Sequence, residues 1–182
     1  MTTITTEPAM RVWIGCLHCY NSGRLVGDWF NAIDADEVTL ANVHRSADGT
    51  QEGCEELWCF DTDDMPVRRE MSPAEAVEWG RVVEAVDEHL RPALVAWVRS
   101  GAYVAEATGD LPSVSDFEER YAGHWDDFDE YAHQLAQDMG LLADVPEEVS
   151  RYFDWRAWTR DLAFDYTTEA DADGGVHVFR SL

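Results

Sequence analysis

Acidic side chains greatly outnumber basic ones in this chain, and the imbalance constrains its fold more than any other feature. The 182 residues include 37 Asp and Glu but only 13 cationic residues, all of them Arg, so the formal net charge at pH 7 is −24. Such an excess of one sign repels itself and lowers the stability of a compact state. Disorder is nevertheless not expected, because 12% of the residues are aromatic and acidic disordered chains are poor in aromatic residues.

The same charge argues against two classes of function. A protein that binds nucleic acid directly needs a basic face to release counterions from the phosphates, and a protein held on anionic lipid needs a similar basic patch. No apolar run approaches the roughly 18–20 residues that span a bilayer, and the first residues show no secretory pattern. We therefore expect a cytoplasmic protein that neither enters a membrane nor binds nucleic acid directly.

Two explanations of this composition require no function. A GC-rich genome favours Arg codons, and a high-salt habitat favours acidic proteins that are poor in Lys. Both predict acids scattered over every exposed face, whereas a functional acidic surface gathers them on one side. Residues 1–100 hold 18 acids and 8 Arg, a net −10, whereas residues 101–179 hold 19 acids and 4 Arg, a net −15.

The size of the charge invites a comparison with DNA. Duplex DNA carries about one negative charge per ~1.7 Å of its axis, so the 24 excess charges of this chain correspond to about 40 Å, or roughly 12 base pairs. Several acidic clusters coincide with predicted helix starts, where the helix dipole stabilises each carboxylate by about 0.3–1 kcal/mol. Because capping needs only one or two acids per helix, it does not account for the whole excess.

Apolar patterning predicts an α+β chain of three small consecutive units, preceded by a mobile tail over residues 1–9. The first unit, residues 10–62, is expected to hold an antiparallel sheet. Its strands are predicted at residues 11–15, 25–30 and 56–60. A turn-rich stretch is expected over residues 18–23, and a short helix capped by Asp34 over residues 34–43.

Residues 63–109 are predicted to form a helical unit. Ser72-Pro73-Ala74-Glu75 is a capping box with Pro at the first helical position, which favours a helix start. One face of this helix is apolar, with Trp79, Val83, Val86 and Leu90 at spacings of 4, 3 and 4. A second helix can begin at Pro92 and end at Gly101.

Residues 110–182 are predicted to form an acidic α/β unit. Ser113 or Ser115 can cap its first helix, and further helices are expected over residues 126–139, from residue 147, and over residues 154–164. The segments 166–168 and 176–179 flank Asp173-Gly174-Gly175, a pattern typical of a C-terminal hairpin.

Cysteine spacing raises the possibility of zinc. Cys16-x2-Cys19 and Cys54-x4-Cys59 each have a spacing that can supply half of a tetrahedral site. However, Cys59 lies in a predicted strand, and Cys16 and Cys19 straddle the end of another. We therefore expect these residues to be buried small hydrophobes and predict no metal.

Other site chemistry is not evident in the sequence. His124 and His133 stand among carboxylates, but a separation of nine residues does not bring them together on one helix. The chain contains no HExxH, GxSxG or GxGxxG motif. We predict no catalytic residues, no cofactor and no enzymatic activity.

Several ordered motifs resemble the ArdA antirestriction proteins. Phe117-x-Glu119-x-Tyr121-x-Gly123-x-Trp125 resembles one stretch of that family, and residues 141–162 resemble its antirestriction motif. Near the front, residues 20–29 (YNSGRLVGDW) resemble the opening pattern YNxGxLxGxW, and Gly175-Val-His-Val-Phe179 resembles the C-terminal strand.

This resemblance implies a DNA mimic encoded by a mobile genetic element. Proteins of the family are elongated homodimers of small units, and their carboxylates imitate bent B-DNA. They occupy the DNA-binding groove of Type I restriction–modification enzymes and block restriction, and often modification as well. The partner implied for this chain is therefore an enzyme of that type.

The predicted partner-binding residues are carboxylates of the third unit that would imitate phosphates. They are Asp116, Glu118, Glu119, Asp126, Asp127, Asp129, Glu130, Asp138, Glu147, Glu148, Asp154, Asp161 and Asp165. We expect Arg151, Arg156 and Arg160 to pair with neighbouring acids.

An aromatic group in the same region is predicted to form either a dimer contact or part of the core. Trp155, Trp158 and Leu162 fall on one face of the expected helix. Tyr152 and Phe153, which precede the helix, complete this group.

Two other classes of function are alternatives. One is a metal-dependent enzyme that uses the Cys or His and Asp groups. The other is an ordinary acidic interaction module or salt-adapted protein, in which neutralising the acidic clusters would leave partner binding intact.

Overall fold

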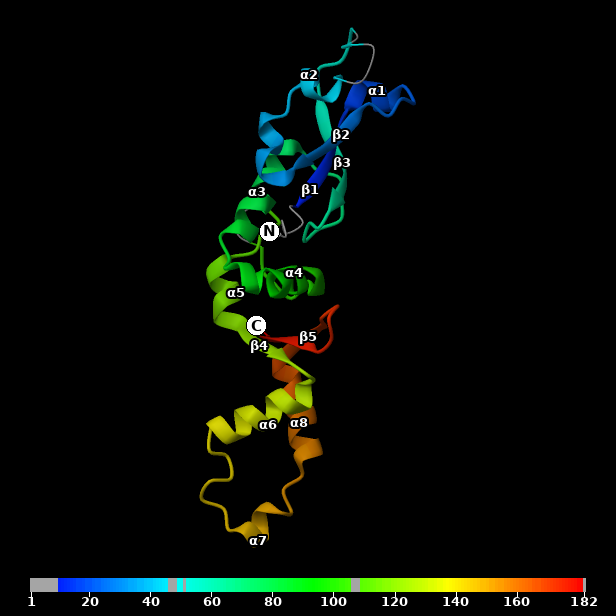
Figure 1. The fold of residues 1–182 in the computed structure, drawn as a ribbon. Helices are drawn as coiled ribbons and strands as arrows, with labels where there is room; N and C mark the ends of the chain where they lie inside the picture. Colours follow the sequence, from blue (N-terminus) through cyan, green and yellow to red (C-terminus); the bar gives the residue numbers. More distant parts are fainter. Residues whose placement is uncertain (1–9, 46–48, 51, 106–108, 182) are drawn as a thin grey trace, which may run out of the picture. The chain divides into compact units, whose positions relative to one another are not determined.

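The computed structural model describes residues 10–45, 49–50, 52–105 and 109–181. It confirms the α+β class, with short helices and two small antiparallel sheets (Figure 1). The chain forms two compact units, Met1–Glu88 and His89–Leu182. The predicted tail, residues 1–9, lies outside the described residues. The division into three units, with boundaries after residues 62 and 109, stays a prediction.

The first unit is built around one three-stranded sheet. Its elements are β1 (Arg11–Cys16), α1 (Leu17–Asn21), β2 (Gly27–Asn31), the 3-10 helix η1 (Ala32–Glu37), α2 (Leu40–Val43), β3 (Leu57–Asp63) and α3 (Pro73–Glu84). The strands lie in the order β2-β1-β3, and both pairings are antiparallel. The three predicted strands are thus confirmed, although their ends differ by up to three residues.

The core of this unit lies between the sheet and α3. Val12 and Ile14 of the central strand are completely buried, as is Trp79 of α3. The Ser72 hydroxyl accepts a hydrogen bond from the Glu75 backbone N–H, so the predicted helix start is confirmed. Burying each large apolar side chain stabilises the fold by about 1.5–3 kcal/mol.

Two local predictions for this unit were wrong. Residues 34–43 do not form one helix, because Thr39 is extended (φ −109°, ψ 162°) and exchanges capping hydrogen bonds with Asn42. This capping box starts a new helix, α2, and leaves η1 as a separate turn. The stretch expected to be turns, residues 18–23, contains most of the short helix α1.

The second unit contains the other sheet. Its elements are α4 (Arg91–Ser100), α5 (Val114–Arg120), β4 (Tyr121–Trp125), α6 (Phe128–Asp138), α7 (Glu147–Ser150), α8 (Trp155–Leu162), the 3-10 helix η3 (Ala163–Asp165), β5 (Tyr166–Ala170) and β6 (Val176–Arg180). A further 3-10 helix, η2 (Glu88–Leu90), precedes α4. The strand order is β4-β6-β5, again antiparallel, and the predicted β5–β6 hairpin is confirmed.

Large aromatic residues form the core of the second unit. Trp97 of α4, Phe117 of α5 and Phe179 of β6 are buried, and the Trp97 and Phe117 ring centroids lie 5.7 Å apart. Gly101 ends α4 in the left-handed conformation (φ 71°), as the sequence predicts. Ser113 rather than Ser115 caps α5.

Strand β4 was not predicted from the sequence. Helix α5 ends at Arg120 and β4 begins at the next residue, Tyr121. No Gly or Pro stands at this junction to indicate the change from helix to strand. Gly123 lies at a shift in the register between β4 and β6. Its φ of 109° is a backbone conformation that would be strained in a residue with a side chain. The strand forms because β6 supplies hydrogen-bonding partners from a segment more than 50 residues away.

Candidate functional site

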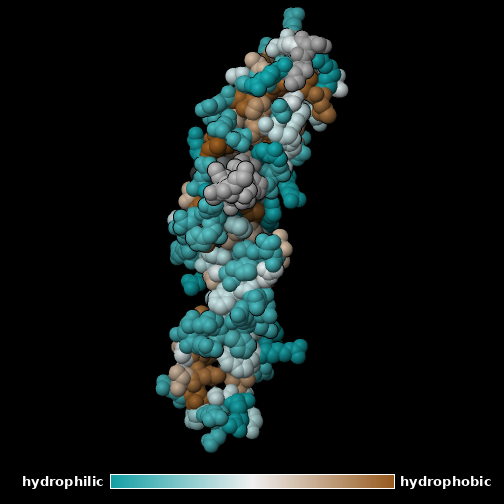
Figure 2. Space-filling view, in the orientation of Figure 1, coloured by the Kyte–Doolittle hydropathy of each residue, from teal (hydrophilic) through white to brown (hydrophobic). Residues whose placement is uncertain are grey.

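Carboxylates cover the surface of both units. The structure describes 34 of the 37 acids, of which 29 are exposed and none is buried. The two compact units have the same net charge. The first holds 18 acids and 6 Arg and the second 19 acids and 7 Arg, so each carries −12. Figure 2 accordingly shows hydrophilic residues over most of the visible face. The charge is therefore a property of the whole chain.

Twelve of the thirteen predicted partner-binding carboxylates are exposed, and Asp116 is half-buried. Seven of them have local structural partners. Four accept backbone or side-chain hydrogen bonds (Asp127, Glu130, Asp138 and Asp154), and three form ion pairs with nearby Arg residues (Asp116, Glu147 and Asp161). These seven carboxylates stabilise the helices as well as contributing charge.

The other six carboxylates make no side-chain hydrogen bond or ion pair with any residue that the structure describes. They are Glu118, Glu119, Asp126, Asp129, Glu148 and Asp165. We call them the free carboxylates. All six are exposed on helices or helix starts of the second unit. They are available to a partner without any loss of internal contacts.

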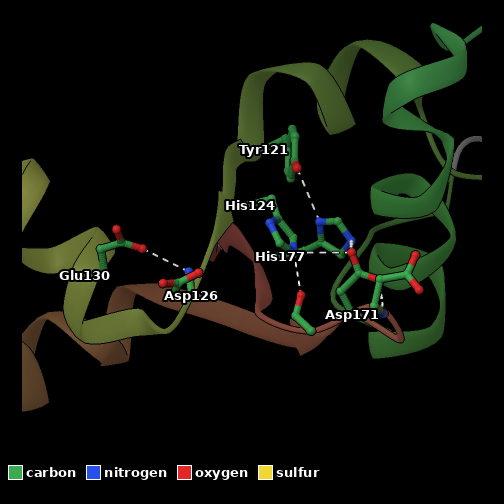
Figure 3. A network of polar contacts seen from close by, with 8 residues as sticks. Tyr121, His124, Asp126, Glu130, Asp171 and His177 are labelled. Carbon is green, nitrogen blue, oxygen red and sulfur yellow. Dashed lines mark hydrogen bonds and ion pairs between the residues drawn. The ribbon is translucent and has the colours of Figure 1, made fainter.

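The start of α6 shows how the fold fixes the positions of several charges. The Asp127 carboxylate accepts from the Glu130 backbone N–H at 2.8 Å. The Glu130 carboxylate accepts from the Asp126 backbone N–H at 2.9 Å (Figure 3). This reciprocal capping satisfies two N–H groups at the helix start. It also holds two carboxylates rigidly, with the Asp126 and Asp129 carboxylates beside them in the sequence.

A set of exposed apolar side chains lies in the same unit, in or beside α6, α7 and η3. Its most exposed members are Tyr152 (84% exposed), Phe164 (82%), Met139 (65%) and Val149 (58%). Hydrophobic atoms appear in the lower part of Figure 2, where Figure 1 shows α6, α7 and α8. We call this set the aromatic surface, together with the half-buried Phe153, Trp155, Trp158 and Leu162. None of the five predicted dimer or core residues is buried.

An open groove of about 600 Å³ runs beside this surface, between α6 and α8. The His133 ring stacks on Trp155 with centroids 4.4 Å apart, and Trp158 packs edge-on against Trp155. Arg156 also lines the groove and makes no ion pair with the described residues. The expected pairing is found for Arg151, with Glu147, and for Arg160, with Asp161.

A second polar cluster joins β4 and β6 to the turn between β5 and β6 (Figure 3). The Tyr121 hydroxyl lies 3.2 Å from His177 Nδ1, and the Asp171 carboxylate lies 3.4 Å from His177 Nε2 and 3.2 Å from His124 Nε2. Burial lowers the pKa of His177, opposed by Asp171 and reinforced by His124. Burial, with the nearby Asp171, raises the pKa of Tyr121.

This cluster does not have the electrostatics of a catalytic triad. A general base or nucleophile needs a pKa moved toward neutrality, whereas that of the Tyr121 phenol moves away from it. His124 Nε2 also lies 2.9 Å from the Gly174 carbonyl, in the turn of the β5–β6 hairpin. The contacts therefore hold the hairpin turn against β4.

The first unit contains the one group of metal-ligating side chains found among the described residues. Cys16, Cys19, His44 and Cys54 are all buried, and their potential ligand atoms lie within 4.8 Å of one another. Burial, with the neighbouring Cys16 and Cys54 thiols, raises the pKa of Cys19 to about 11. Cys59, whose spacing from Cys54 had suggested half of a site, lies in β3 opposite Ile14, as its predicted strand position implies, and is outside this group.

Comparison with known protein families shows to which family the chain belongs. The model of the family described as "Antirestriction protein (ArdA)" matches residues 12–177. The chain belongs to the ArdA antirestriction protein family. Membership of ArdA implies an antirestriction function and an interaction with restriction–modification enzymes, and ArdA is not a family of known enzymes. No curated protein matches the sequence significantly.

The ArdA match spans both compact units and includes all thirteen predicted carboxylates and the aromatic surface. No helix in the described part of this ArdA chain has the length and apolarity needed to cross a bilayer. Sequence analysis missed His44 and the groove beside α8. The only sequence feature that marks His44 is its residue type, because 24 residues separate it from Cys19.

Proposed function

We propose that this ArdA protein is a DNA mimic that occupies the DNA-binding groove of a Type I restriction–modification enzyme. In this proposal it blocks restriction by excluding DNA from the enzyme. It would act in the cytoplasm, where the enzyme meets incoming DNA, on behalf of a mobile genetic element. The observation that carries the proposal is membership of the ArdA family over residues 12–177. The six free carboxylates, which the fold leaves exposed on helices and helix starts of the second unit, support it.

The amount of charge suits this role. The net charge of −24 equals that of roughly 12 base pairs of duplex at about one charge per ~1.7 Å. A basic groove built for DNA would attract such a surface over distances near the Debye length, which is about 8–10 Å at physiological salt. Complementary charge of this kind raises the association rate and excludes partners of the wrong sign.

The fixed positions of the charges also suit mimicry. Phosphates are held at regular positions by a stiff duplex, so a mimic that had to order its carboxylates on binding would lose affinity. Asp127 and Asp154 are held by helix N-terminal hydrogen bonds of 2.8 and 2.9 Å. Asp126 and Asp129, which flank the capping residue Asp127 in the sequence, are free carboxylates at the start of α6.

We propose further that two copies pair through the aromatic surface. Monomeric proteins rarely expose large contiguous apolar patches, and here Tyr152 and Val149 are more than half exposed in a unit that carries −12. A twofold pairing would place the same surface of both copies together, so that Arg156 of each groove could meet carboxylates of the other copy. Such a dimer would double the length of DNA imitated.

Competition with duplex DNA tests the proposal. A Type I enzyme is mixed with labelled duplex carrying its recognition site, and the ArdA protein is titrated in. We expect inhibition that titrates with the ArdA protein, is overcome by excess duplex and weakens steeply with added salt. Salt-insensitive or substoichiometric inhibition would overturn the mimicry proposal.

A matched pair of variants locates the binding surface. One variant changes the six free carboxylates to amides, which leaves the helix caps intact. The control changes six exposed acids of the first unit, namely Asp34, Asp36, Glu37, Glu52, Glu55 and Glu56. We expect a much larger loss of binding from the first variant, because its carboxylates belong to the proposed surface. Equal losses would show that total charge alone drives the interaction.

A further inference from the structure

Four metal-ligating side chains from distant parts of the chain lie together at the end of the first sheet where β1 ends and β3 begins. Cys16 is the last residue of β1, and Cys19 lies in α1. His44 follows α2, and Cys54 lies in the loop that leads to β3. Their relative exposures are 1%, 1%, 4% and 7%. Four such side chains in one solvent-excluded place require a chemical explanation beyond simple packing.

Their spacing is close enough for tetrahedral coordination of one ion. Zinc binds thiolate sulfur at about 2.3 Å, so two sulfurs of a tetrahedral site lie about 3.8 Å apart, and a sulfur and an imidazole nitrogen lie about 3.6 Å apart. Cys19 Sγ and Cys54 Sγ are 3.8 Å apart, and all four potential ligand atoms fall within 4.8 Å of one another. A disulfide needs an S–S distance of about 2.05 Å, and none of the cysteines, all of which lie among the described residues, forms a disulfide.

His44 is oriented as a ligand would be. Its Nδ1 lies 3.1 Å from the Gly49 carbonyl oxygen, which can only accept, so Nδ1 carries the proton and donates. Nε2 is therefore left with a lone pair, and this atom is buried without a hydrogen-bond partner among the described residues. A buried unsatisfied polar atom costs about 1–3 kcal/mol. Metal-binding histidines commonly donate the other ring N–H to a carbonyl in this way.

We propose that Cys16, Cys19, Cys54 and His44 Nε2 bind one Zn²⁺ ion in a closed structural site. Three thiolates and one imidazole are a ligand set that zinc prefers. Four protein ligands leave no position for a reactive water, which distinguishes a structural from a catalytic zinc. The ion would tie the ends of β1 and α2 to the start of β3.

Cys59 provides a matched control for this site. It is completely buried in β3 and lies outside the group of four. Its substitution removes a buried thiol from the same unit without removing a proposed ligand. Any effect of losing a buried cysteine that is unrelated to metal should therefore appear in Cys59→Ala as well.

Metal analysis of the purified full-length protein tests the proposal. Under reducing conditions we expect about one zinc ion per chain, unchanged in Cys59→Ala and lost in Cys16→Ser, Cys54→Ser and His44→Asn. Chelation should lower the melting temperature of the wild type and of Cys59→Ala. Protein that contains no metal and takes up none when zinc is supplied would overturn the proposal, as would equal loss of zinc from Cys59→Ala.

Cobalt substitution keeps the test informative if a ligand variant fails to fold. The wild-type chain, stripped of metal and supplied with Co²⁺ under reducing conditions, should show thiolate-to-cobalt charge transfer and the strong visible absorption of tetrahedral Co²⁺. Added Zn²⁺ should displace these bands. An octahedral cobalt spectrum, or a Cys19–Cys54 disulfide in protein isolated with thiols blocked, would overturn the site.

Discussion

The two compact units carry the same net charge, but they differ in how exposed their large apolar side chains are, and only the first contains cysteines. In the first, the cysteines are buried and the sheet packs on α3, with Leu25 its most exposed large hydrophobic residue at 77%. In the second, Tyr152 and Phe164 are both more than 80% exposed. Because the net charge of −12 is common to both, it cannot account for this difference. The exposed aromatic residues indicate that the second unit is the one with a surface available to a partner.

The difference suggests a division of labour within a DNA mimic. The first unit has the features of a support, with a fully buried core and the proposed zinc site. The second has the free carboxylates and the aromatic surface, which are features of an interface. Four experiments can break or sharpen this comparison, and they follow in order of decreasing expected effect.

The largest effect should come from emptying the core of either unit. Trp79 in the first unit and Trp97 in the second are both at most 1% exposed. Replacing either by Ala should reduce the free energy of unfolding by about 3–5 kcal/mol, because the transfer energy is lost and a cavity is left. Urea denaturation followed by circular dichroism measures this. Trp29→Ala, at a position 38% exposed, should cost less, and a similar cost there would contradict our placement of the core.

The next largest effect should be on dimerisation. Tyr152→Ser removes the most exposed aromatic side chain of the aromatic surface, and a central aromatic contact is worth about 2 kcal/mol or more. We expect the dimer dissociation constant to rise about 30-fold, as measured by sedimentation or light scattering over a range of concentrations. Leu25→Ser, in the first unit, serves as control and should leave it unchanged. A monomeric wild type, or an equal effect of both changes, would remove the aromatic surface as the dimer contact.

A smaller effect should follow from removing the cap of α8. The Asp154 carboxylate accepts from the Ala157 backbone N–H at 2.9 Å, and replacing such a residue by Ala typically costs about 1 kcal/mol. Asp154→Asn should retain most of that stability while losing the charge. Comparing both variants separates the capping role from any role in enzyme binding. If Asp154→Ala proves as stable as the wild type, the carboxylate has no capping role.

The smallest effect should be a pH dependence from the second sheet. The pKa of His177 is lowered by burial below its ordinary value of 6.5, so the unfolded chain binds its proton more readily. Stability from this residue is fully present above about pH 6.5, the ordinary pKa that the unfolded chain retains, and is lost as the pH falls from there through the lowered pKa of the folded state. The wild type should therefore lose more stability than His177→Gln between about pH 7.5 and about pH 5.5. A larger loss in the variant would reverse the sign of the argument.

Local chemistry allowed several elements to be predicted correctly. The helix α3 begins at Pro73 because Ser72 supplies an acceptor and Pro needs none. The end of α4 at Gly101 follows equally from one residue, because glycine adopts the left-handed conformation without strain. The acidic surface could also be predicted, since unpaired carboxylates seldom enter a core.

Contacts between distant segments account for what could not be predicted. Strand β4 exists because β6 pairs with it, and a short segment such as Tyr121–Trp125 carries too weak a pattern to reveal that pairing. The helix predicted over residues 34–43 from a cap at Asp34 was wrong, because the capping box of Thr39 and Asn42 starts a new helix within that range. His44 lies near the cysteines because α2, which it follows, packs beside β1, and the sequence does not show that packing.

The sequence alone therefore determined the charge, the family resemblance, and those helices and strands whose ends are set by single residues, because each depends on composition or on neighbours in the chain. The tertiary structure decided which carboxylates are free, which aromatic residues stay exposed, and which histidine meets Cys16, Cys19 and Cys54. Those outcomes depend on how distant segments pack, since burial and ligand geometry arise only when side chains far apart in the sequence share one space.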